Sequence, residues 1–156
     1  MPSNATAKTK SGHSRARALV FFSAAVSVLL IRAVLPYGPP TATLRLHGHT
    51  LSLQIADTAQ ARAQGLSGKA AMDVNQGMLF TYQEPTKQCF WMKGMHFPLD
   101  MIWLNADMRV VYLKQRLSPR SYPELFCTPT AAQYVIELNG GVSRTLGVHE
   151  GAQLHF

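Results

Sequence analysis

The sequence contains only two cysteines, only 15% charged residues and no acidic residue from Met1 to Pro36. Because 47% of the residues are hydrophobic, so little charge excludes an intrinsically disordered chain, and 156 residues fit one packed domain with an appendage. The sequence also lacks a Walker loop, a dinucleotide-binding fingerprint, an H-E-x-x-H helix and a G-x-S-x-G elbow. These absences exclude the enzyme classes that depend on those motifs.

The positive charge is concentrated near the amino terminus. Residues 1–36 carry five basic side chains and no acidic one, whereas residues 37–156 carry ten basic and eight acidic side chains. The body of the chain therefore contributes only +2 to the net charge of +7. A nucleic-acid-binding domain needs a basic surface, so we expect no nucleic-acid partner for this body.

The first 36 residues have the pattern of an export signal. Residues 1–17 form a basic n-region expected in the cytoplasm, and residues 18–36 form an apolar segment whose first fourteen residues are uncharged. No A-x-A cleavage site follows, which favours an uncleaved signal-anchor. The chain would then cross the cytoplasmic membrane once, with its N-terminus inside and its domain outside, in the periplasm of a Gram-negative cell. A cleaved signal, giving a secreted protein, and a buried core helix are the alternatives.

The rest of the chain is predicted as a linker over residues 37–43 and a mainly β domain over residues 44–156. Alternating or β-branched runs predict strands at residues 44–46, 51–55, 78–82, 89–92, 100–104, 109–114, 134–138 and, as a closing strand, 152–156. Short helices are expected at residues 57–65 and 142–146. So many short strands with so little helix indicate a compact jelly-roll-like sandwich or small barrel, preceded by the N-terminal signal-anchor helix.

Six motifs follow one another from about Leu51 to Phe156. They are Ile55-Ala-Asp-Thr, Arg62-x-x-Gly65-Leu66, Gly77-Met-Leu-Phe80, Phe90-Trp-Met-Lys93, Pro98-Leu-Asp100 and Val135-Ile-Glu-Leu-x-Gly-Gly141. In this order they resemble the domain of unknown function 192 family, a group of small, often exported prokaryotic proteins. The resemblance implies a compact, mostly β, jelly-roll-like domain whose molecular activity is not established.

The sequence departs from the pattern of that family at three places. Gly94-Met95 replaces a polar pair such as Asn-Thr, Ser67 replaces Met, and Gly151-Ala152 replaces Gly-Asp. Any role of the family's polar groups at these positions is therefore in question here.

Two carboxylates, Asp100 and Glu137, lie inside apolar strand segments within the family-like motifs. A carboxylate that enters a β core must be paired or hydrogen-bonded, and Arg62 or Lys93 could supply the partner. One hypothesis is a polar pocket beside Trp91 that binds a small ligand through these residues or performs acid–base catalysis. The alternative is a structural ion pair that pins the short helix to the sheet.

Three sulfur-containing side chains and one histidine lie within eight residues of each other: Cys89, Met92, Met95 and His96. Thiolate and thioether ligands suit Cu(I), so copper is the alternative to our expectation of no cofactor. Methionine is also a common core residue.

His47 and His49 resemble a metal-binding pair, but the sequence supplies no third ligand nearby, and an exposed strand face is the simpler interpretation.

The two cysteines, Cys89 and Cys127, are separated by 38 residues and lack C-x-x-C spacing. An even number of cysteines outside the cytoplasm favours one structural disulfide, while two free thiols remain the alternative. Trp91 and Trp103 could stack on a sugar or lie in the core.

The sequence thus predicts a membrane-anchored, extracytoplasmic β domain that binds a small ligand or a partner protein of the cell envelope. An envelope hydrolase with paired carboxylates at Asp100 and Glu137, and a copper-handling protein, are the alternatives.

Overall fold

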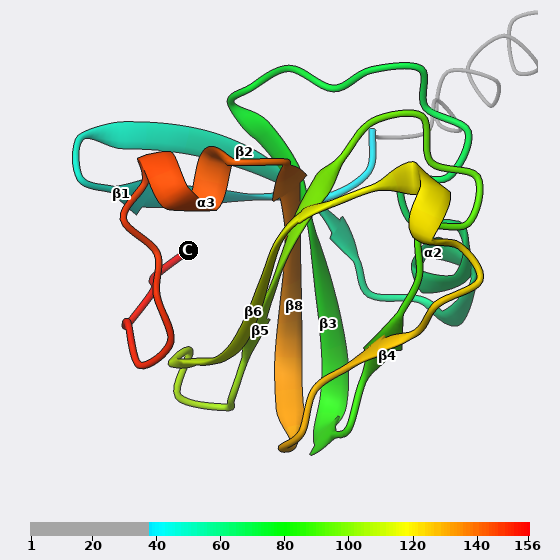
Figure 1. The fold of residues 1–156 in the computed structure, drawn as a ribbon. Coiled ribbons are helices and arrows are strands. Elements are labelled where there is room, and N and C mark those ends of the chain that lie inside the picture. Colours follow the sequence, from blue (N-terminus) through cyan, green and yellow to red (C-terminus); the bar gives the residue numbers. More distant parts are fainter. Residues whose placement is uncertain (1–37) are drawn as a thin grey trace, which may run out of the picture. The chain divides into compact units, whose positions relative to one another are not determined.

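The computed structural model describes residues 38–156, and the predicted signal-anchor over residues 18–36 lies outside them (Figure 1). Along the chain the elements are β1 (Thr41–Leu46), β2 (His49–Ala56), α2 (Ala59–Gln64), β3 (Gln76–Thr86), β4 (Cys89–Phe90), β5 (Leu99–Leu104), β6 (Val110–Leu117), the 3-10 turn η1 (Pro119–Ser121), β7 (Phe126–Cys127), β8 (Ala132–Asn139) and α3 (Val142–Thr145). The predicted mainly β fold with two short α-helices is confirmed. Within residues 38–156, no helix combines the length and the apolar character needed to cross a bilayer.

Six strands form one mixed sheet in the order β1-β2-β3-β8-β5-β6. Strands β2 and β3 are parallel, because the chain returns between them through α2 and a loop, and the other neighbouring pairs are antiparallel. Strands β4 and β7 form a separate two-stranded ribbon. The sheet is open, with β1 and β6 at its edges, so the predicted small barrel is wrong.

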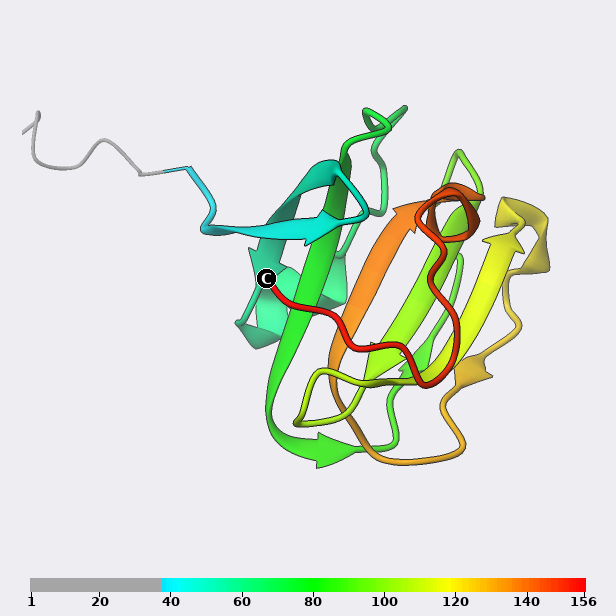
Figure 2. The same cartoon turned by 90° about the vertical axis from the view of Figure 1, so that its left-hand side faces the viewer.

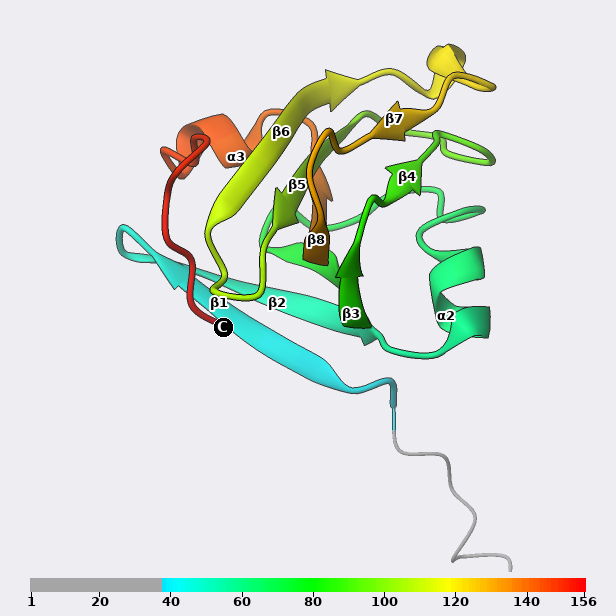
Figure 3. The ribbon, with the colours of Figure 1, turned by 90° about the horizontal axis from the view of Figure 1, so that it is seen from below.

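Each face of this sheet is covered by a different part of the chain. One face buries Leu79, Ile102 and Ile136 together with residues from α3 and the C-terminal segment. We call it the α3 face. The other face, which we call the cleft face, buries Met78, Phe80 and their neighbours beneath α2 and the β4–β7 ribbon. Figure 3 shows α3 and α2 on these opposite sides, and in Figure 2 the C-terminal segment crosses the α3 face.

Burial on both faces explains why β5 lacks the alternation of a half-exposed strand. All of Leu99–Leu104 is buried, with successive side chains entering opposite cores. At the start of β3, Gly77 allows close packing, because a Cβ there would lie 2.6 Å from Leu138 Cδ2 and 2.7 Å from the Glu137 carbonyl oxygen. A larger residue at position 77 would therefore push β3 away from β8.

The structure departs from the sequence-based expectations at several places. Strand β3 runs to Thr86 and β6 to Leu117, beyond the predicted ranges, and no predicted strand covers β7. Strand β1 begins at Thr41, inside the predicted linker. The predicted closing strand over residues 152–156 is wrong, because this segment forms only an isolated bridge between Gln153 and Arg109. The segment still contributes Leu154 to the core of the α3 face.

Candidate functional site

Glu137 is the buried carboxyl group of the cleft face. It lies on the central strand β8, and its cross-strand neighbours are Met78 on β3 and Met101 on β5. Its side chain is 4% exposed, and burial raises its pKa to about 8. Among the hydrogen bonds of residues 38–156, none reaches the Glu137 carboxyl group. The carboxyl group is therefore mostly protonated at pH 7.

A small cleft opens above Glu137, between α2 and the segment that follows β4. Its walls combine aromatic, thioether and polar groups, contributed by Arg62, Ala63, Gln64, Gly65, Leu66, Ser67, Phe80, Phe90, Trp91 and Met95, with Glu137 among them. Its volume is about 40 Å³, which accommodates a few water-sized groups, since roughly 10–15 Å³ suffices for one. Only one end of a ligand could enter.

Helix α2 forms one wall of the cleft because both of its ends are capped. The Thr58 hydroxyl accepts a hydrogen bond from Ala61 N at 3.1 Å, and Gly65 ends the helix with φ 50° while its N–H donates to the Ala61 carbonyl. Arg62 fixes the helix to the sheet, since its Nη1 donates to the carbonyl oxygens of Asp57 at 2.7 Å and Thr81 at 2.9 Å. Arg62 therefore bonds to backbone carbonyls and not to either predicted carboxylate.

Tyr82 on β3 contacts Arg62 and is affected by the charge of Glu137. The Arg62 guanidinium carbon is 5.0 Å from the centroid of the Tyr82 ring, a cation–π contact. Burial raises the pKa of the Tyr82 hydroxyl, Arg62 opposes that rise, and Glu137 adds to it. Tyr82 thus remains neutral at physiological pH.

The mouth of the cleft is formed by Trp91, which is 48% exposed. Lys93 Nζ lies 5.3 Å from the centroid of the Trp91 ring, and the Tyr122 ring meets Trp91 edge-on at 6.0 Å. The Ser67 hydroxyl donates to the Lys93 carbonyl oxygen at 2.8 Å and ties the two sides of the mouth together. Ser67 and Trp91 therefore belong to one packed rim.

Asp100 lies on the opposite side of the sheet from Glu137. The register pairs Asp100 with Leu138 and Met101 with Glu137, so the two carboxyl groups enter different faces. Asp100 is fully buried, and its two oxygens accept hydrogen bonds from the backbone N–H groups of Arg116, Gly141 and Ser143 and from the Ser143 hydroxyl, at 2.7–2.9 Å.

This geometry gives Asp100 a structural role at the start of α3. The N-cap residue Gly141 has no capping side chain, and Asp100 supplies the missing acceptor from β5. The predicted pocket in which Asp100 and Glu137 act together is therefore not formed. Paired-carboxylate hydrolysis requires both groups beside one bond, so the geometry gives this alternative no support.

The four predicted copper ligands do not form a set. Cys89 is bonded to Cys127 and is not available as a thiolate. Met92 and Met95 are both buried in the cleft-face core, because the chain turns at Gly94 with φ 66°, while His96 is exposed. Within residues 38–156, no three His, Cys, Asp or Glu side chains gather as a group that could hold a metal ion.

The two histidines of the first hairpin, His47 and His49, have different surroundings. His47 Nδ1 lies 2.9 Å from the Leu146 carbonyl oxygen, at the end of α3. His49 begins β2 and is exposed. Gly48 lies in the turn between them, so the pair does not share a strand face.

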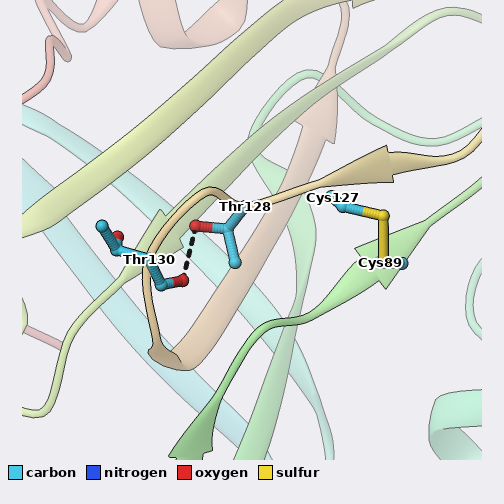
Figure 4. Close-up of a disulfide and its surroundings, with 4 residues drawn as sticks. All are labelled: Cys89, Cys127, Thr128 and Thr130. Carbon is cyan, nitrogen blue, oxygen red and sulfur yellow. Dashed lines mark hydrogen bonds between the residues drawn. A yellow bond between two sulfur atoms is a disulfide. The ribbon is translucent and has the colours of Figure 1, made fainter.

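The disulfide between Cys89 and Cys127 joins β4 to β7, as the cysteine count predicts (Figure 4). The two cysteines are register partners in the ribbon. Beside them, the Thr128 hydroxyl donates to the Thr130 carbonyl oxygen at 2.9 Å. The ribbon carries Phe90 and leads directly into Trp91, so the disulfide closes the structure that supports the cleft wall.

Sequence reasoning missed Phe80, Phe90 and Tyr82 as neighbours of Glu137. Strand periodicity offered a signal, because Met78, Phe80 and Tyr82 alternate along β3 and share one face. It also missed Ser143 as the partner of Asp100, since only the docking of α3 on β5 brings them together.

Comparisons with known proteins agree with this architecture. The family model for DUF192, an uncharacterised ACR, matches residues 42–156. The chain belongs to the DUF192 family. UPF0127 proteins of Thermococcus kodakarensis and Thermococcus gammatolerans are 36% and 35% identical to it, over 64% and 67% of this chain. The matches span 60% and 64% of those relatives, which is less than two thirds of their length.

Two solved structures have folds similar to that of this chain. A protein of unknown function from Novosphingobium aromaticivorans matches with a TM-score of 0.71 and 25% identity, over 78% of this chain and 89% of that one. A Sinorhizobium meliloti protein described as a proposed transcription regulator matches with a TM-score of 0.67 and 30% identity, over 72% and 89%. The family and these neighbours leave the molecular function open.

Proposed function

We propose that the DUF192 domain of this chain is an extracytoplasmic binding domain, anchored by residues 18–36, which takes one end of a small polar ligand into the cleft above Glu137. The ligand comes from the cell envelope, either as a small molecule or as an exposed group of a partner protein. Glu137 and the aromatic wall at Trp91 recognise it, and Arg62 holds the α2 wall in place.

The observation that carries this proposal is the contrast between the burial of Glu137 and its lack of a protein partner among residues 38–156. Burial removes part of the hydration of the Glu137 carboxyl group, and this loss costs free energy and raises its pKa. A core position that served stability alone would be better filled by an apolar residue of similar size. A ligand that hydrogen-bonds to the carboxyl group offsets this cost and gives the glutamate a function.

The proposed location outside the cytoplasm is supported by the basic segment that precedes an apolar run, and by the Cys89–Cys127 disulfide. An alkaline phosphatase fused after Phe156 would be active in cells if this orientation is correct. An inactive fusion, with phosphatase activity restored when residues 1–36 are replaced by a known signal-anchor, would overturn it. The molecular mass of the exported chain distinguishes an anchor from a cleaved signal.

The binding role can be tested with three small probes that differ in charge: acetate, acetamide and propylammonium. Each is titrated into the isotopically labelled full-length protein, and the amide signals of Gly65 and Ser67 and the indole N–H of Trp91 are followed. We expect at least one probe to shift these signals in a saturable way. The shift should be lost in Glu137→Leu and retained in Glu84→Gln, which changes an exposed carboxylate on β3.

No saturable shift with any of the three probes would overturn the binding role. Equal shifts in the wild type and in Glu137→Leu would do the same, because the cleft would then not be the site. Thermal unfolding of each variant shows whether the domain is still folded when these signals are read.

The description of the Sinorhizobium meliloti protein suggests transcription regulation as a second function. Residues 37–156 carry a net charge of only +2, which does not favour binding to DNA. We therefore propose no nucleic-acid partner for this chain.

A further inference from the structure

The cleft combines an acidic group at its base with aromatic walls, and this combination identifies a class of ligand. We propose that the cleft binds the primary ammonium end of an amine, which donates hydrogen bonds to the Glu137 carboxylate while its first methylene groups contact Phe90 and Trp91. This inference rests on the binding role proposed above.

The first argument is the state of the Glu137 acceptors. Its oxygens receive no hydrogen bond from residues 38–156, and burial alone accounts for the direction of its pKa shift. Arg62, the nearest wall cation, is held elsewhere by the carbonyls of Asp57 and Thr81 and by the ring of Tyr82. Residues 38–156 therefore offer Glu137 no positive partner, and an ammonium group would supply both the charge and the donors.

The second argument is the chemistry of the walls. Phe80 and Phe90 meet edge-on with their ring centroids 4.9 Å apart, and Trp91 also lines the cleft. Aromatic rings attract cations, Trp most strongly. Lys93 already places its ammonium group 5.3 Å from the centroid of the Trp91 ring. The rim thus contains one ammonium–aromatic contact of the kind that the ligand would make deeper in the cleft.

The third argument is size. The cleft of about 40 Å³ accepts an ammonium group and little more, since a water-sized group needs roughly 10–15 Å³. A carboxylate ligand would bring a second acid against Glu137, while Nη1 of Arg62 already donates to two backbone carbonyls. An amine is therefore the better complement, and the rest of its molecule must lie outside, across Trp91.

Binding of this kind exchanges protons. An alkyl amine is protonated at neutral pH, so the proton that leaves the Glu137 carboxyl group on binding passes to solvent. The other titratable and charged groups that face this position are Tyr82 on β3, Arg62 on α2 and Lys93 at the rim. Tyr82 has a raised pKa and stays neutral, and Arg62 stays charged. The affinity for the amine should therefore rise by about tenfold per pH unit while Glu137 is protonated.

The test is calorimetric titration of the full-length protein with propylammonium at pH 6, 7 and 8, in two buffers of different ionisation enthalpy. We expect release of roughly 0.9 proton per amine bound at pH 7 and a steep rise in affinity from pH 6 to pH 7. Glu137→Gln should weaken binding by more than about tenfold, and Glu84→Gln should not. Lys93→Gln should strengthen it by about twofold, because an exposed like charge is removed.

Affinity independent of pH, or propylammonium binding unchanged in Glu137→Gln, would overturn the amine assignment. Because the pH series uses the wild type, this test stands even if a variant fails to fold. If acetate or acetamide binds in the cleft while propylammonium does not, the amine assignment fails and the binding role survives. If none of the three binds, both proposals fail.

Discussion

The two faces of the six-stranded sheet each bury one carboxyl group and surround it in opposite ways. On the α3 face, Asp100 accepts four hydrogen bonds from β6 and the start of α3. On the cleft face, Glu137 accepts none from residues 38–156 and lies between Met78 and Met101. The two side chains come from adjacent positions of the β5–β8 register, so the difference arises from the parts of the chain that cover each face.

This contrast separates a carboxyl group that holds two elements together from one that residues 38–156 leave without a hydrogen bond. The hydrogen bonds of Asp100 hold α3 against the sheet. Because its oxygens already accept these four bonds, they are not available to a ligand. No hydrogen bond from residues 38–156 reaches the Glu137 carboxyl group, and burial raises its pKa. A buried acid that can exchange its proton through an open cleft is therefore the better candidate for function.

The largest effect is expected for Asp100→Asn. Each Asp100 oxygen accepts two hydrogen bonds, so the amide nitrogen of Asn would face two donors where an acceptor is needed, and the network that caps α3 would break. We expect the free energy of unfolding to fall by about 3–5 kcal/mol, measured by chemical denaturation. The control Asp107→Asn changes an exposed acid of the β5–β6 turn. A loss below about 1 kcal/mol would show that Asp100 is not the structural member of the pair.

An effect of similar size is expected when the Cys89–Cys127 disulfide is removed. In Cys89→Ser/Cys127→Ser the unfolded chain is no longer constrained by the loop of 38 residues. The loop-entropy relation gives a loss of about 4 kcal/mol. Because the ribbon supports Phe90 and Trp91, binding of propylammonium should weaken together with stability. Reduction of the wild type with dithiothreitol should reproduce both effects, and unchanged unfolding after reduction would contradict this role of the ribbon.

Most of the strands and both short α-helices could be predicted from the sequence, but the ribbon strand β7 and the separation of the two carboxylates could not. Alternation and turn residues locate β2, α2 and β8 closely, because these signals are local. Whether Asp100 and Glu137 share a face depends on the register between β5 and β8, and a shift by one residue would reverse the result. No local pattern carries that register, and β5 has no alternation because both of its faces are buried.

The same reasoning explains the other differences between sequence and structure. Residues 152–156 have the composition of a strand, yet only Gln153 finds a bridge partner, at Arg109. Arg62 suggested a partner for a carboxylate, whereas the capped end of α2 brings its guanidinium to backbone carbonyls. In each case the partner of the residue depends on which distant segment of the chain packs beside it. The local spacing of residues in the sequence does not specify that packing.

Per pH unit, a smaller effect is the pH dependence that Glu137 gives to stability. Its pKa is about 8 in the folded protein and 4.5 as the ordinary value, so between these values the folded state binds more protons than the unfolded state. The free energy of unfolding should therefore fall as the pH rises through this window, by about 1.4 kcal/mol per pH unit from this group, and level off above pH 8. Glu137→Gln should match the wild type near pH 4.5 and exceed it at pH 8.

Denaturation curves of both proteins between pH 5 and pH 9 measure this difference. Subtracting the two series removes the contributions of histidines and other groups that titrate in both. Parallel curves would mean that Glu137 ionises normally in the folded protein, and the contrast with Asp100 would then lose its basis.

The smallest effect concerns a single hydroxyl group on the α3 face. The Ser143 hydroxyl donates to Asp100 at 2.7 Å and accepts from Gln115 Nε2 at 2.9 Å, so Ser143→Ala removes one of the four bonds to Asp100 and leaves the backbone N–H of residue 143 in place. We expect a loss of about 1–2 kcal/mol, against no change for Ser52→Ala, which alters an exposed serine of β2.

A double-mutant cycle measures the coupling between Ser143 and Asp100. If Asp100 and Ser143 act in one network, Ser143→Ala should cost much less in the Asp100→Asn background than in the wild type, because its partner has already been removed. Equal costs in the two backgrounds would mean that the hydroxyl packs against α3 independently of the carboxylate. The α3 face would then be held by packing alone, and hydrogen bonding would no longer distinguish its buried acid from that of the cleft face.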